Sequence, residues 1–168
     1  MRSQTEFLDA YRQDHQHPTN QLIHMICVPV IVFSTLGLLW CLQIGQWLGL
    51  PADVAEYVNV ATLGGLLAFG FYLKLSVRSA LVMTLWFGLS VLGILALGGA
   101  GWLLAGVCAG LWIAAWALQF YGHEVEGAKP SFADDLVFLL IGPLFVMEKV
   151  YRRLGLRSGY DTAVLKRG

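Results

Sequence analysis

The residues best suited to chemistry are the four histidines, which occur in two short segments at either end of the apolar part of the chain. Three of them fall within HQHPTNQLIH, residues 15–24. The proline of this segment suits the first turn of a helix, where a missing N–H costs nothing. Asn20 and His24 would then lie one turn apart on the same face of that helix. His15 and His17 precede the helix, on irregular backbone.

The fourth histidine belongs to GHEVEGAKP, residues 122–130. His123 and Glu126 are three residues apart, so they share a face if the helix continues that far. A glycine and a proline further along the segment then end the helix. Glu126 has two open interpretations: it takes part in a site with His123, or it is a solvated charge that pairs with Lys129.

Several imidazoles with one carboxylate form a ligand set that suits a transition metal. Imidazole binds zinc, copper, iron and nickel, and its combination with carboxylate also suits iron or manganese. The spacing does not match a zinc motif such as HExxH, so the pattern alone does not choose the metal. The alternative is that the histidines are only polar groups at a membrane edge, and that Asn20 hydrogen-bonds loop backbone.

The elements between the two histidine segments are strongly apolar. The chain has 168 residues, of which 57% are hydrophobic and 13% are charged, whereas an ordinary soluble domain has about 25% charged residues. A membrane span needs roughly 20 apolar residues, and a soluble protein with four such segments would have too little polar surface to cover itself. We predict a single all-α membrane domain over 1–168, with four spans at about 19–43, 55–74, 79–97 and 101–122.

Two further helices are expected outside the spans. The first is an amphipathic helix at about 3–14, before the first apolar run. The second is an apolar helix at about 133–151, which Gly142, Pro143 and Glu148 interrupt. These interruptions favour an interfacial or re-entrant segment over a fifth span. An aspartate of the pair Asp134–Asp135 would cap this helix.

The basic residues favour an even number of spans. All eleven precede the first span, separate the second from the third, or follow the fourth. With four spans they lie on one side, which the positive-inside rule makes cytoplasmic, together with both termini and all four histidines. The membrane would be the inner membrane of a bacterium or the endoplasmic reticulum of a eukaryote. Eleven acidic residues balance the basic ones, so the charge gives no support for a nucleic-acid partner.

Taken as a set, these motifs resemble a family of small membrane proteins typified by the fungal 2-hydroxy fatty acid dioxygenase of phytosphingosine breakdown. The resemblance rests on HQHPTNQLIH with Pro29 after it, on QFYGHEVEGAKP at 119–130, and on GPLFVMEKV at 142–150. These motifs cover most of the chain in order, with similar apolar spacing between them.

The resemblance implies a membrane-bound dioxygenase that depends on Fe²⁺, iron(II). The implied reaction consumes dioxygen, releases carbon dioxide and leaves a fatty acid one carbon shorter. The metal ligands carried over from the family are His15, His24 and His123, with His17 as a fourth candidate. Glu126 carries over as the acidic residue, either as a ligand or as a partner that orients one.

A 2-hydroxy fatty acid suits such a site because its carboxylate and hydroxyl can chelate iron together. Asn20 would orient a ligand or hydrogen-bond the carboxylate, and Lys129 or Arg78 would attract the carboxylate by charge. One alternative is another lipid-modifying metalloenzyme, such as a hydroxylase. The other is a small transporter or scaffold without enzyme activity, although no inverted repeat supports a transporter. Oligomeric state is not predicted.

Overall fold

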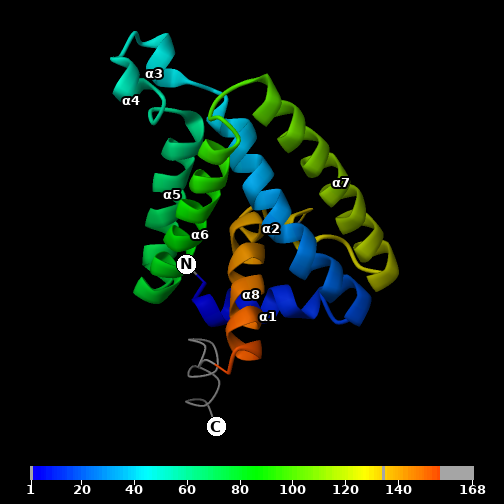
Figure 1. The fold of residues 1–168 in the computed structure, drawn as a ribbon. Coiled ribbons are helices and arrows are strands. Elements are labelled where there is room, and N and C mark those ends of the chain that lie inside the picture. The colour runs from blue at the N-terminus through cyan, green and yellow to red at the C-terminus, as the bar shows by residue number, and fades with distance from the viewer. Residues whose placement is uncertain (1, 134, 156–168) are drawn as a thin grey trace. The chain divides into compact units, whose positions relative to one another are not determined.

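The computed structural model describes residues 2–133 and 135–155, and the regular elements within these ranges are all helical (Figure 1). The predicted all-α class is thereby confirmed. In chain order, the elements are α1 (Gln4–Gln13), α2 (Pro18–Trp40), α3 (Ile44–Trp47), α4 (Ala52–Ala55), α5 (Val60–Leu75), α6 (Val77–Ala96), α7 (Trp102–Glu126), η1 (Ser131–Ala133) and α8 (Phe138–Arg153). The basic tail with Arg157, Lys166 and Arg167 lies outside the described residues, as does Asp134, one of the two candidate caps. The other candidate, Asp135, accepts a hydrogen bond from the Val137 N–H, but the N-cap of α8 is Val137 itself, without a side-chain cap.

Three of the helices are long and apolar enough to cross a membrane. They are Pro18–Trp47, which joins α2 to α3, and the helices α6 and α7. α5 is also apolar, but its 16 residues span about 24 Å at 1.5 Å per residue, less than the roughly 30 Å of a hydrocarbon core. The structure therefore supports a helical membrane protein, whereas the count of four spans stays a prediction.

The second expected span begins later than the hydropathy indicated. The side chain of Asn59 accepts a hydrogen bond from the Thr62 N–H and so caps α5 at its first turn. The preceding residues form the short helices α3 and α4 instead, with Pro51 as the residue before α4. Because an N-cap satisfies N–H groups that would otherwise be orphaned, it fixes the start of a helix more sharply than hydropathy does.

The helices fall into two compact units, each described here by itself: Met1–Pro29 with Ala117–Gly168, and Val30–Trp116. In the second unit α5 and α6 run side by side (Figure 1), with Gly65 facing the ring of Phe87. Elsewhere in this unit Gly37 of α2 contacts Cys108 of α7. Small residues let membrane helices approach closely, while leucines such as Leu67, 78% exposed, face outward.

In the first unit α8 crosses α1 and packs against it (Figure 1). α1 begins with a capping box between Ser3 and Glu6 and buries Phe7, Leu8 and Tyr11 on one face, as expected for an amphipathic helix. The Phe7 ring meets the Phe138 ring edge-on, with centroids 6.0 Å apart.

α8 starts five residues later than expected and continues through Gly142 and Pro143 without a break. Gly142 is needed here, because a Cβ at this position would lie 3.0 Å from the Tyr11 hydroxyl oxygen. Gly142 therefore does not interrupt the helix, but allows α8 to approach α1 closely. Whether α8 is interfacial or re-entrant stays a prediction.

Candidate metal site

Glu126, at the end of α7, connects that helix to the loop before α2. Its carboxylate accepts hydrogen bonds from the backbone N–H groups of Gln16 and His17, both at 2.8 Å, and from the Asn20 amide at 3.1 Å. N–H groups at the start of a helix lack partners within it and favour a negative charge. Glu126 therefore fixes the path of the chain on both sides of His17 and the position of Asn20.

Three histidines meet beside this junction. His15 in the loop, His24 on α2 and His123 on α7 are 1%, 5% and 6% exposed. Each offers a ring nitrogen, and these nitrogens lie within 4.8 Å of one another. The closest pair is Nε2 of His15 and Nε2 of His24, which are 3.0 Å apart.

The tautomers of two of these histidines follow from their backbone contacts. Nδ1 of His15 lies 2.6 Å from the Tyr11 carbonyl oxygen, and Nδ1 of His24 lies 3.0 Å from the Asn20 carbonyl oxygen. A carbonyl oxygen only accepts, so both Nδ1 atoms carry hydrogen and donate. In a neutral imidazole the Nε2 atom is then a bare lone pair, which is the form that binds a metal.

Two bare lone pairs 3.0 Å apart repel each other unless a cation lies between them. A proton on His15 would remove the repulsion, but burial lowers the pKa of His15 to about 4, despite the opposing effect of the Tyr11 carbonyl. The proton is therefore absent at neutral pH. His123 adds a buried Nδ1 without a hydrogen-bond partner. The donor set fits a metal ion, and the three histidines can hold one.

Two buried amides lie on the same helix faces as the histidines. Asn20 precedes His24 by one turn of α2, and Gln119 precedes His123 by one turn of α7. Oδ1 of Asn20 and Oε1 of Gln119 are both buried without a hydrogen-bond partner. Gly122 makes room for the first, because a Cβ there would lie 2.5 Å from the Asn20 oxygen.

Tyr11 is a site residue that the sequence did not reveal. Its ring stacks on the His15 ring, with centroids 4.0 Å apart and planes 11° apart, while its carbonyl fixes the same imidazole. Burial raises the pKa of the Tyr11 phenol well above its usual range, with a smaller contribution from Asp14, so the phenol stays neutral. An aromatic on the apolar face of a helix looks like a core residue, and only its position four residues before His15 gives a signal.

Gln21 and Lys149 were also missed. The Gln21 amide donates to the His15 carbonyl oxygen at 2.7 Å, and its own oxygen accepts from Lys149 Nζ at 2.8 Å. Lys149 Nζ also lies 4.9 Å from the centroid of the Phe145 ring. α8 is thus connected to the histidine loop by a chain of polar contacts that no spacing in the sequence predicts.

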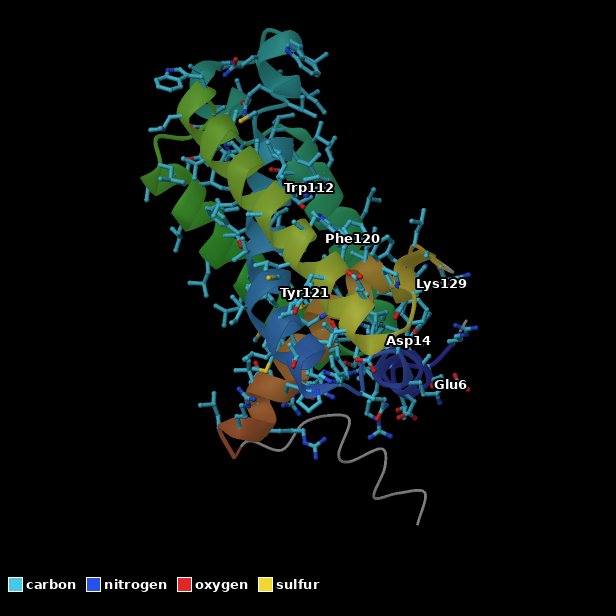
Figure 2. All side chains as sticks on the ribbon, turned by 90° about the vertical axis from the view of Figure 1, so that its right-hand side faces the viewer. Glu6, Asp14, Trp112, Phe120, Tyr121 and Lys129 are labelled. Atoms are coloured by element: carbon cyan, nitrogen blue, oxygen red, sulfur yellow. The ribbon has the colours of Figure 1, made fainter. Side chains whose placement is uncertain are left out.

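Some predicted site residues are not members of the cluster. His17 is exposed, and its Nδ1 accepts from the Thr19 N–H at 3.2 Å. Lys129 is exposed in the loop after α7 (Figure 2), and Arg78 belongs to the second unit. Among the described residues the mutually close ligand atoms are those of the three buried histidines, without His17 or Glu126. The ligand roles of these residues stay predictions.

The similarity to known proteins covers almost the whole chain. Residues 1–154 match the family described as 2-hydroxy-palmitic acid dioxygenase Mpo1-like. The chain is 31% identical over 157 residues to a protein of Saccharomyces cerevisiae named 2-hydroxy-palmitic acid dioxygenase MPO1, an alignment that covers 92% of this chain and 82% of the yeast protein. No solved structure matches it. The chain belongs to the Mpo1-like family, as its histidine, glutamate and proline motifs indicated.

Proposed function

We propose that this protein is an iron(II)-dependent dioxygenase that shortens 2-hydroxy fatty acids by one carbon. The observation that carries the proposal is the pair of bare Nε2 atoms of His15 and His24, 3.0 Å apart and buried beside His123. The name of the yeast relative, which specifies dioxygenase activity on 2-hydroxypalmitic acid, supports the substrate class.

The proposed reaction balances without an additional reductant. A 2-hydroxy acid and one dioxygen yield the acid one carbon shorter, carbon dioxide and water. The bond between C1 and C2 breaks, C1 leaves as carbon dioxide, and C2 is oxidised from an alcohol to a carboxylic acid. The four electrons released by the substrate reduce the dioxygen. A hydroxylase, which is the alternative function, would need an external electron donor.

The residues of the first unit provide the ligands and hold them in place. His15, His24 and His123 would hold the iron, which supplies the redox chemistry that lets dioxygen react with a closed-shell substrate. The Tyr11 ring and carbonyl hold the His15 imidazole in one orientation. Asn20 does the same for His24 through its carbonyl, and Glu126 holds Asn20 through its amide.

The amide oxygens of Asn20 and Gln119 are the proposed acceptors for polar hydrogens of the substrate. Both are buried and have no partner in the protein, and a buried acceptor left unsatisfied costs about 1–3 kcal/mol. The Asn20 amide cannot rotate by 180° without losing its bond to Glu126, so its oxygen stays oriented away from that carboxylate. A substrate hydroxyl is a donor of the right kind.

The test is anaerobic purification, titration with iron(II), and then oxygen consumption with 2-hydroxypalmitate. We expect iron to bind, dioxygen to be consumed, and pentadecanoate and carbon dioxide to appear in equal amounts. Failure to take up iron would overturn the metal assignment. Iron binding with consumption of an added reductant, and a product of unchanged chain length, would favour the hydroxylase.

A further inference from the structure

Lys149 is a half-buried cation near the middle of a polar network. Its ammonium group donates to the Gln21 side-chain oxygen at 2.8 Å and lies over the Phe145 ring. Within residues 2–133 and 135–155 it has no carboxylate partner. Lysines removed from water are normally paired with an anion, so this position lacks the partner that its charge favours.

The surroundings of Lys149 increase this need for an anion. Burial lowers the pKa of Lys149, and the neighbouring Arg153 and Arg152 lower it further by repulsion. An amide oxygen and an aromatic face compensate a desolvated ammonium only in part. A negatively charged ligand at this point would relieve both the desolvation and the repulsion.

Lys149 is also close to the histidine cluster. Gln21, which accepts from its ammonium group, donates to the carbonyl of His15. The Phe145 ring beneath the ammonium lies 6.4 Å from the His15 ring, centroid to centroid. The charge of Lys149 is near enough to act electrostatically on His24. An anion bound by Lys149 would therefore lie beside the buried histidines.

We propose that Lys149 binds the carboxylate of the fatty acid substrate and so selects acids over neutral lipids of the same length. This inference rests on the proposed function, because it assigns a partner to the substrate of that same site. Lys149 takes the place of Lys129, the cation of the same unit that the sequence suggested, which is exposed to solvent.

The test compares an acid with its uncharged analogue. Binding of 2-hydroxypalmitate and of 2-hydroxypalmitamide is measured by anaerobic titration of the iron-loaded full-length protein in nanodiscs of neutral lipid, for wild type and K149Q. A hydrogen bond to a charged group contributes about 1.5–3 kcal/mol, so K149Q should bind the acid roughly 10- to 100-fold more weakly. Amide binding and iron content should not change.

Two further variants support the comparison. K149M keeps the aliphatic stem over Phe145 and serves as a second uncharged variant if K149Q disturbs folding. K129Q removes an exposed cation of the same unit and should leave both affinities unchanged, which controls for the general charge of the surface. In turnover, K149Q and K149M should raise KM for the acid much more than they lower kcat.

The outcomes separate this inference from the function on which it rests. Equal losses for acid and amide in both Lys149 variants, or no loss for either ligand, would overturn the role of Lys149 and leave the dioxygenase intact. A similar loss of acid binding in K129Q would point to a general effect of surface charge and would also overturn the role of Lys149. Wild-type protein that takes up iron but binds no 2-hydroxypalmitate would overturn the substrate itself.

Discussion

The two halves of α2 each bury a few side chains, and these side chains serve different purposes. In the first unit the helix presents Asn20 and His24, polar side chains with 0% and 5% exposure, to the candidate metal site. In the second unit it presents Gly37 and Trp40 to an apolar core that includes Cys108. One continuous helix thus contributes a proposed metal ligand at one end and close packing at the other.

α7 shows the same division. Its C-terminal part carries Gln119, His123 and Glu126 in the first unit, whereas Leu104 and Cys108 belong to the core of the second. Polar groups within apolar surroundings are costly unless they are satisfied or functional. The comparison teaches that the candidate site is marked by the place where buried polar groups gather.

The largest expected effect comes from removing a proposed metal ligand of the first unit. His24→Ala should lower iron affinity by at least about 100-fold, more than the loss typical for residues that only orient a ligand. Oxygen consumption with 2-hydroxypalmitate should fall with it. The measurement is iron content after dialysis against a weak chelator, together with oxygen uptake.

The matched control for this prediction is His17→Ala. His17 lies seven residues before His24, but its side chain is exposed and its Nδ1 accepts only a local N–H. The variant should retain its iron. Equal losses in the two variants would show that His17 is a fourth ligand and that the site extends beyond the buried cluster.

A smaller loss of iron is expected from Glu126→Ala. The carboxylate holds two backbone N–H groups and the Asn20 amide, so its removal frees the loop that carries His15. Residues that orient ligands typically affect metal affinity by about 10- to 100-fold. The variant should still saturate at higher iron concentration, and a loss as complete as that of His24→Ala would identify Glu126 as a ligand.

Much of this arrangement could be predicted from the sequence. Apolar run lengths and the position of Pro18 located α2, α6 and α7 to within a few residues, because span length is set by bilayer thickness. The family motifs indicated His15, His24 and His123, which the structure brings together. These features depend on local pattern, which a single sequence contains.

The features that escaped prediction depend on contacts between distant segments. Nothing near Lys149 in the chain indicates Gln21, 128 residues away, as its partner. In the sequence, Tyr11 cannot be distinguished from an aromatic residue that only packs in a core. Its contact with the candidate site becomes visible only in the structure, where its ring stacks on the His15 ring. The late start of α5 depends on the cap at Asn59. This cap is a local signal, but the predicted start of the span followed the hydropathy instead.

Two glycines of α7 sharpen the comparison between the units. Gly122→Ala would bring a Cβ within 2.5 Å of the Asn20 oxygen, and overpacking of this kind costs about 1–3 kcal/mol. Because Asn20 also holds His24, iron affinity should fall as well, by roughly 10-fold. Unfolding in mixed micelles and iron titration measure the two effects.

Gly110→Ala is the control on the same helix. A Cβ at Gly110 meets nothing within 4 Å, and replacing an open helical glycine by alanine typically stabilises by about 0.4–1 kcal/mol. This variant should be as stable as wild type or more so, with unchanged iron affinity. A loss of iron in both variants would mean that substitutions anywhere along α7 affect the candidate site. The proposed difference between the two halves of the helix would then be wrong.

The smallest effect is expected from the polar contact between Trp112 and Thr35 in the second unit. The indole N–H donates to the threonine hydroxyl at 3.2 Å, and single hydrogen bonds between membrane helices contribute about 0.6 kcal/mol on average. Thr35→Val should therefore lower the free energy of unfolding only slightly, and Thr35→Ser, which keeps the hydroxyl, should lower it less. Iron affinity should stay at the wild-type value in both, because this hydrogen bond orients no ligand. A loss of iron in Thr35→Val would show that polar contacts of the apolar unit also support the site, and the distinction between the two halves of α2 would no longer hold.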